Sequence, residues 1–334
     1  NFYNYTFIPL PSLVMKKISS FFSLSILLAS FLHAQNADQV QSRIEGTQRS
    51  QPAPVTGANT GSQSGDSAGA SASDTGAQRP ISLKEDGISA FFGYDTNYFY
   101  RSNPLAQSGD LRQLKTAMWT NTFFGGAGLG ILETDNSVIT PYIGGSWTIN
   151  DYIEDQLSQF NYNSTSAYAL LLAQYGNGWS TRIGVNYSND RSSQFDTEDY
   201  SEFFPNIGVM KAYTLSDQTT AIFDAYLGQH STEIASIGNS PEDLLDNFEI
   251  AASYGLKYIQ GDLTFSPKYL LSYKTYDNGA NSDRDDLTHN FSLVAGYPLA
   301  DSFDLDLFGS YTIRDSSESA NDYKNLDGGI GLKL

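Results

Sequence analysis

The chain of 334 residues contains no cysteine and only three histidines. The lack of thiols excludes a disulfide framework, a thiolate zinc site, an iron–sulfur cluster and a cysteine nucleophile. Positive charge is also scarce, because 19 lysines and arginines stand against 37 aspartates and glutamates, giving a formal net charge of −18. Such a chain offers no basic patch to neutralise phosphates, so we expect no nucleic acid partner. We also expect no cofactor and no metal site.

The N-terminal region resembles a secretory leader. Met15 is followed by two lysines and by an apolar run over residues 21–32, which ends just before Ala34. Twelve residues are too few to span a bilayer as a helix, which takes about 20. We therefore expect a signal peptide over residues 15–34, cleaved after Ala34, and an upstream or non-native extension over 1–14. A buried N-terminal helix is the alternative.

Residues 35–82 have the composition of a disordered linker. No aromatic residue occurs between positions 35 and 79, and residues 56–78 are all Gly, Ala, Ser, Thr, Asn, Gln or Asp. Such a segment cannot bury enough apolar surface to offset the entropy lost on ordering. We predict a periplasmic spacer here, with a plug or tether as the alternative.

From residue 83 to residue 334 the chain repeatedly alternates apolar and polar side chains. In residues 248–258, Phe248, Ile250 and Tyr254 alternate with Glu249, Ser253 and other polar or small residues. Residues 179–187, 263–274 and 303–314 follow the same pattern. Because successive side chains of a strand point to opposite faces, each segment predicts a strand with one apolar and one polar face.

The connections between these segments fall into two classes, short turns and longer polar loops. Short turns are expected at residues 134–137, 176–178, 216–218, 260–262 and 300–302. Long polar loops are expected at residues 102–114, 151–158, 189–199, 231–246, 277–286 and 315–322. Alternating in this way, they join about twelve strands into an antiparallel up-and-down β-barrel. Ten or fourteen strands, or a soluble β-sandwich or propeller, remain alternatives. Residues 164–175 alternate poorly, which indicates either a β-bulge or an inward aromatic residue.

This region resembles the Gram-negative outer-membrane β-barrels, porin-like proteins with short periplasmic turns, long outer loops and aromatic girdles. The resemblance implies a bacterial outer-membrane location with both termini periplasmic, outer-membrane lipid around the barrel, and insertion by the barrel-assembly machinery. The last residue departs from the pattern, since it is Leu334 and not an aromatic residue. The implied girdle residues are Tyr98, Trp147, Tyr175, Trp179, Tyr187, Tyr213, Tyr258, Tyr273, Tyr297 and Tyr311.

The same alternation places charged side chains of both signs inside the barrel. The predicted lumen-lining residues are Asp95, Arg182, Asp224, Glu249, Lys257, Lys268, Lys274, Asp304, Asp306, Arg314 and Lys333. They would tune selectivity in a water-filled lumen or pair across a closed one. The acidic loops, with Asp190 and Asp286 among their carboxylates, are expected to be solvated; binding of divalent cations is the alternative.

Catalysis is not expected. A signal peptide would carry His33 away and leave His230 and His289. His230 is followed by Ser231, whose side chain would point to the opposite face of the strand, and we expect this histidine to be an interfacial polar residue at the rim. We therefore predict a narrow diffusion channel for small solutes. The alternatives are a non-conducting surface barrel whose acidic loops bind a partner and, with less support, a membrane-embedded hydrolase.

Overall fold

The computed structural model describes residues 88–104, 115–235, 243–300 and 302–334. The predicted extension over 1–14, the leader over 15–34 and the linker over 35–82 lie outside the described residues.

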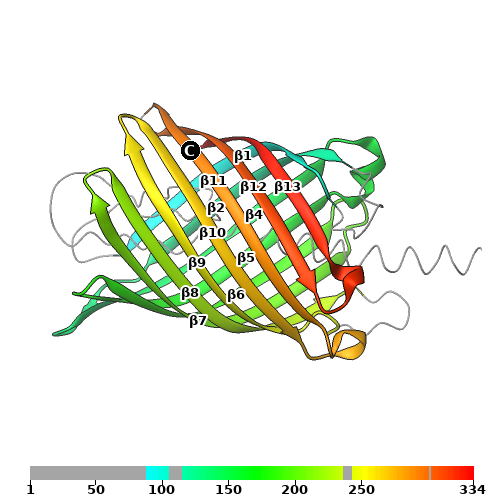
Figure 1. Ribbon diagram of the computed structural model, residues 1–334, viewed down its shortest axis with the longest axis horizontal. Coiled ribbons are helices and arrows are strands. Elements are labelled where there is room, and N and C mark those ends of the chain that lie inside the picture. The colour runs from blue at the N-terminus through cyan, green and yellow to red at the C-terminus, as the bar shows by residue number, and fades with distance from the viewer. Residues whose placement is uncertain (1–87, 105–114, 236–242, 301) are drawn as a thin grey trace, which may run out of the picture.

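The described residues form a closed antiparallel β-barrel (Figure 1). Its twelve long strands are β1 Ser89–Arg101, β2 Thr116–Gly128, β4 Ser137–Tyr152, β5 Tyr162–Tyr175, β6 Trp179–Ser192, β7 Glu198–Ser216, β8 Thr219–Ile234, β9 Asn247–Gln260, β10 Leu263–Tyr276, β11 Asp285–Ala300, β12 Phe303–Ser316 and β13 Tyr323–Lys333. A two-residue strand, β3 Leu132–Glu133, pairs with β4 beside the first turn.

Strand β1 closes the ring by pairing with β13 on one side and with β2 on the other. The pairing with β13 runs from Asp95 opposite Lys333 to Arg101 opposite Asp327. The terminal Leu334 adds two backbone hydrogen bonds to Tyr94. Because β2 also pairs with β4, no long strand is left as an edge, as lipid requires of a spanning sheet. The predicted up-and-down barrel of twelve strands is confirmed, and the alternative strand counts are wrong.

The two classes of connection lie at opposite ends of the barrel, here called the turn end and the loop end. Tight turns follow β5, β7, β9 and β11, and Gly178 and Gly261 adopt positive φ values of 81° and 61° in two of them. The first turn is wider, because β2 and β3 both pair with β4 and Gly130, at φ 104°, lies in the unpaired gap between them.

The loop end differs from the prediction in how far the strands extend. The connection between β6 and β7 comprises only residues 193–197, because the two strands continue to Ser192 and from Glu198. Other loops contain short 3-10 helices, η2 Asp155–Phe160, η3 Gly279–Asn281 and η4 Ser319–Asn321. Within the described ranges, none of the helices has the length and apolar character needed to cross a membrane.

The two faces of the wall differ as the alternation predicted. On β10, Tyr273 is 41% exposed on the outer face, whereas its neighbours Ser272 and Lys274 are 4% and 9% exposed on the inner face. The irregular segment 164–175 lies in β5, which pairs without a register shift on both sides. Its inner face carries Tyr168, whose ring lies over Gly144 of β4. The inward aromatic residue, and not a bulge, explains the poor alternation.

Candidate functional site

The barrel lumen is the candidate site, because most of the buried polar and charged side chains of the described residues lie at inward positions of the strands. All eleven residues predicted to line the lumen lie on the inner face of their strands, opposite the exposed apolar side chains. For twelve strands spaced about 4.8 Å and tilted about 40°, the backbone diameter is about 24 Å. Side chains on both walls leave a passage of at most about 10 Å.

Charged side chains are confined to part of the lumen wall. The described inward positions of β2, β4 and β5 hold only uncharged residues, among them a band of hydroxyl groups. The hydroxyls of Thr122 and Thr148 are 3.0 Å apart, and those of Ser146 and Ser166 are 2.7 Å apart. One side of the lumen is therefore neutral and the rest is charged.

An ion pair between Arg182 and Asp224 spans three strands near the turn end. The guanidinium donates two hydrogen bonds of 2.6 and 2.8 Å from β6 to the carboxylate on β8. It passes over Gly208 of the intervening β7, where a Cβ atom would lie 2.9 Å from the Arg182 Cζ atom. The pair is half-buried, and its planar two-point geometry suits a guanidinium and a carboxylate.

Two further ion pairs lie along β13, next to the closing seam. Arg101 of β1 donates hydrogen bonds of 3.1 and 3.2 Å to Asp327, and both side chains are buried. Lys333 pairs with Asp306 of β12. The seam between the first and last strands is thus joined by charge as well as by backbone hydrogen bonds.

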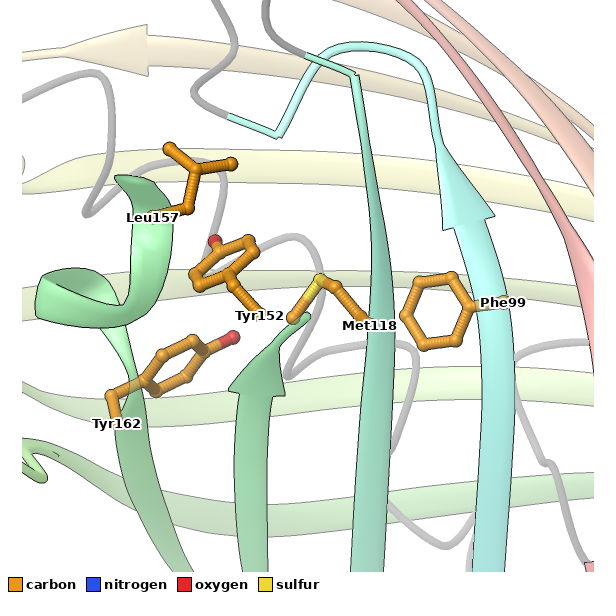
Figure 2. Packing of buried hydrophobic residues seen from close by; sticks show 5 residues of the cluster. All are labelled: Phe99, Met118, Tyr152, Leu157 and Tyr162. Atoms are coloured by element: carbon orange, nitrogen blue, oxygen red, sulfur yellow. The ribbon is translucent and has the colours of Figure 1, made fainter. Parts of the chain in front are cut away.

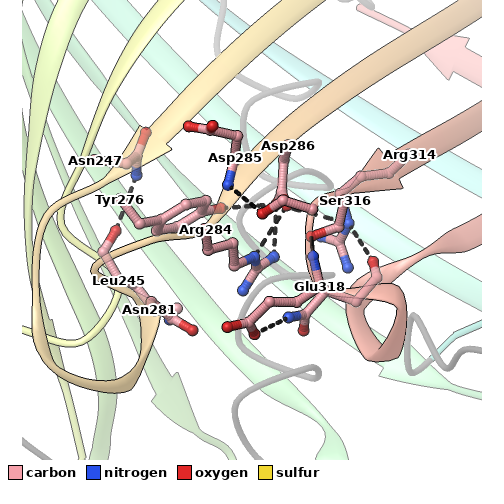
Figure 3. A network of polar contacts seen from close by, with 12 residues as sticks. Leu245, Asn247, Tyr276, Asn281, Arg284, Asp285, Asp286, Arg314, Ser316 and Glu318 are labelled. Carbon is pink, nitrogen blue, oxygen red and sulfur yellow. Dashed lines mark hydrogen bonds and ion pairs between the residues drawn. The ribbon is translucent and has the colours of Figure 1, made fainter.

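A third group of charges lies at the loop end around Asp286 (Figure 3). Arg284 donates hydrogen bonds of 3.0 and 2.5 Å to this carboxylate, and the phenol of Tyr276 donates one of 3.2 Å. Arg314 approaches the same carboxylate at 3.9 Å and donates a hydrogen bond to the backbone oxygen of Asn321 in the β12–β13 loop. The network therefore ties two loops to the inner wall.

A fourth group centres on His230. Its Nδ1 atom lies 2.5 Å from Glu202 and its Nε2 atom 2.9 Å from Glu249. The imidazole is 1% exposed and is stacked on Phe204, with 3.8 Å between ring centroids. The expectation of an interfacial histidine at the rim is therefore wrong, because the extended β8 carries this position into the lumen wall.

Two clusters of apolar side chains also lie at the loop end. One contains Phe99, Met118, Tyr152, Tyr162 and Leu157, and Figure 2 shows Leu157 on η2 beside the strands that carry the other four residues. The other joins Tyr200, Ile234 and Tyr276 to Leu245 of the β8–β9 loop. Leu157 and Leu245 are 2% and 3% exposed, so two loops are anchored inside the rim.

Sequence reasoning missed several inward charges and misplaced two. Arg101, Glu202 and Asp327 were not predicted. Asp190 and Asp286 were expected in solvated loops, but each lies inside a strand and is 1% exposed on the inner face. The strands run further than the turn chemistry indicated. Continuing the odd-even alternation past the expected strand ends would have placed Asp190 and Asp286. Applying it to every position inside the expected strands would have placed Arg101, Glu202 and Asp327.

The constellations expected for a hydrolase are not assembled at the two histidines. His230 and Ser231 lie on opposite faces of β8. His289 lies on the outer face of β11, where the phenol of Tyr269 is 2.8 Å from its Nδ1 atom. Among the described residues, no group of three or more histidine, aspartate or glutamate side chains could hold a metal ion.

The outer face of the barrel is apolar. Its exposed side chains include Phe92, Ile183, Leu307 and Ile330, each at least half exposed, from strands all around the ring. The ten residues expected in the aromatic girdles all lie on this outer face. A closed sheet that is apolar outside and polar inside is suited to hydrocarbon surroundings. The chain has the fold of a bacterial outer-membrane β-barrel.

Known structures with a similar fold include barrels of this kind. An outer-membrane channel from Pseudomonas putida F1 is 10% identical, with 75% of this chain and 96% of that chain covered and a TM-score of 0.47. The translocator domain of autotransporter NalP from Neisseria meningitidis is 11% identical, with 75% and 89% covered and a TM-score of 0.41. A KdgM porin in complex with disordered oligogalacturonate is 12% identical, with 72% and 98% covered and a TM-score of 0.38.

At these identities and TM-scores the likeness says nothing about the function of this barrel. Comparisons with models of protein families and with curated proteins gave no match.

Proposed function

We propose that the barrel is a narrow diffusion channel for small solutes that are uncharged or cationic. The observation that carries the proposal is the inner wall, which bears buried polar or charged side chains on each of the twelve long strands. A wall of this kind favours water and small polar solutes. The short turns and both termini lie on the periplasmic side in this proposal, and the long loops face the outside.

The charge pattern of the wall supports this class of solute. Arginine and lysine side chains are engaged by carboxylates, as in the pairs Arg182–Asp224, Arg101–Asp327 and Lys333–Asp306. Pairing removes most of the attraction for anions, and the neutral wall offers hydroxyl groups to uncharged solutes. With a passage of at most about 10 Å, the lumen excludes folded protein.

The outer surface fits outer-membrane lipid as the surrounding partner. Aromatic side chains such as Trp147 and Tyr187 towards the loop end, and Tyr175 and Tyr213 towards the turn end, would rest at the two interfaces. Insertion by the barrel-assembly machinery belongs to the same proposal.

Conductance in planar lipid bilayers tests the channel. The refolded barrel is expected to give small, discrete conductance steps in potassium chloride. Arg182→Gln leaves the Asp224 carboxylate without its counter-charge and should raise the preference for potassium over chloride. Arg191→Gln is the matched control, because Arg191 pairs at 3.6 Å with Asp196 in a solvent-exposed loop. Absence of any conductance from the unaltered protein over a wide range of salt would contradict the proposal.

A second candidate is a non-conducting surface barrel whose loops bind a partner. The side chains gathered at the loop end favour it, since both apolar clusters and the Arg284–Asp286–Arg314 network lie there. Liposome swelling separates the two candidates. Vesicles that contain the barrel should swell in small neutral sugars if it conducts, whereas vesicles that do not swell, together with cell adhesion that depends on the loops, would select the second candidate.

A further inference from the structure

Four neighbouring strands share one hydrogen-bonded chain of side chains on the lumen wall. Tyr200 of β7 donates a 2.5 Å hydrogen bond to Glu202 of the same strand. Glu202 contacts His230 of β8, which contacts Glu249 of β9. Ser272 of β10 completes the chain by donating to the second oxygen of Glu249. Both carboxylates are thus held by a neighbouring hydroxyl as well as by the imidazole.

While both glutamates are ionised, the contacts of the imidazole favour its protonated form. A carboxylate can only accept a hydrogen bond, so each ring nitrogen of His230 must donate one. Only the protonated ring has two N–H groups. Phe204 stacks on the ring and keeps it between the carboxylates, and Gly228 makes room, since a Cβ atom there would lie 2.5 Å from the Phe204 Cε2 atom.

Charged groups of both signs surround the protonated ring. Glu202 faces it from β7, Glu249 from β9, and Lys274 from β10 acts on the ring and on both carboxylates. Tyr226 on β8 lies near Glu249. Asp190 of β6 lies near Tyr200, on the Glu202 side of the ring. Loss of the histidine proton therefore makes the net charge of this part of the wall more negative by one.

We propose that protonation of His230 makes the charge selectivity of the lumen depend on pH. The inference rests on the proposed channel function. When His230 gives its proton to lumen water, only the covalent N–H bond to that proton breaks. The neutral ring has one N–H group left, so one of its two hydrogen bonds to the carboxylates is lost. The added negative charge then attracts cations and repels anions in the narrow passage. Histidine is the residue type that titrates in the physiological range.

Reversal potentials in a potassium chloride gradient test the proposal. Between about pH 5 and about pH 9, the potassium-to-chloride permeability ratio of the unaltered barrel should rise about fourfold. This is the size expected of one elementary charge about 10 Å from the permeating ions in water. In His230→Gln the rise should disappear. Glu249→Gln should lower the ratio at high pH and keep the pH-dependent rise.

His289→Gln is the matched control, since this histidine lies on the outer face against Tyr269 and should leave the rise unchanged. A rise that persists in His230→Gln, or one that disappears in His289→Gln, overturns the proposal and leaves the channel itself intact.

A second measurement separates this inference from the channel. The thermal unfolding midpoint in detergent should fall between about pH 5 and about pH 9, because a neutral ring no longer separates two carboxylates with a positive charge. The fall should be smaller in His230→Gln than in the unaltered barrel. If no variant conducts, the proposed function fails, and this comparison alone decides whether His230 carries the charge described. Equal falls in both proteins would show that it does not.

Discussion

Inward glycines make room for long side chains that cross the lumen wall. At Gly208 a Cβ atom would meet the Arg182 guanidinium at 2.9 Å and the backbone oxygen of Ala225 at 3.0 Å. We expect Gly208→Val to displace Arg182 from Asp224 and to destabilise the barrel by about 1–3 kcal/mol, as overpacking does. Denaturant unfolding in detergent measures this. The control is Gly176→Ala, where nothing lies within 4 Å; equal losses in both variants would contradict the explanation.

The buried pair of Arg101 and Asp327 gives a second prediction for single residues. Arg101→Met leaves the Asp327 carboxylate buried without its counter-charge, which costs about 3–5 kcal/mol in buried pairs. The double variant Arg101→Met, Asp327→Leu should recover a large part of the loss, because no charge is then left buried. Unfolding free energies of the two single variants and the double variant measure the coupling. If the losses in unfolding free energy of the two single variants simply add in the double variant, the pair does not stabilise the seam.

The sequence largely predicted whether a residue lies on the inner or the outer face of its strand, but it did not predict which side chains it contacts. Odd-even alternation placed Asp95, Arg182 and Lys333 on the inner face because adjacent side chains of a strand point in opposite directions. The contacts of His230 depend on residues 28 and 19 positions away in sequence, Glu202 and Glu249. No local pattern specifies the register that brings these three together.

The short helix η2 shows how one residue can hold a loop to the rim. Leu157 is 2% exposed among Met118, Tyr152 and Tyr162, so Leu157→Ser should release residues 153–161 while the strands remain paired. We expect protease cleavage within this loop to increase about tenfold or more, with a small change in the unfolding midpoint. Phe195→Ser is the control, since that loop residue is 65% exposed. Loss of the folded barrel, without selective cleavage, would contradict this role.

The existence and order of the strands were predictable, but their lengths at the loop end were not. Polar residues such as Asn189, Asp190 and Arg191 have the composition of a loop, yet they lie in β6. Beyond the hydrocarbon layer a strand no longer needs an apolar outer face, so its sequence resembles that of a loop while its backbone remains paired. The turn end was easier to predict, because Gly and Asn at residues 176–178 are residues that tight turns favour.

For the whole molecule, closure follows from the pairing of β1 with β13, which no sequence pattern indicates directly. The even number of strands suggested it, since a spanning sheet in lipid cannot leave an edge unpaired. The central claim is therefore that alternate residues of every strand face lipid around a closed ring. Since the chain has no cysteine, single cysteines can be introduced along one strand and labelled with a fluorophore.

Quenching by brominated lipid along β10 is the most direct test. In vesicles, labels at Pro267, Tyr269 and Leu271 should be quenched strongly, because these positions lie on the outer face. Labels at Lys268, Leu270 and Ser272 should be quenched weakly, because they face the lumen. Strong and weak quenching that alternate residue by residue is the predicted result. Uniform quenching along the strand, or none at any position, would contradict the account.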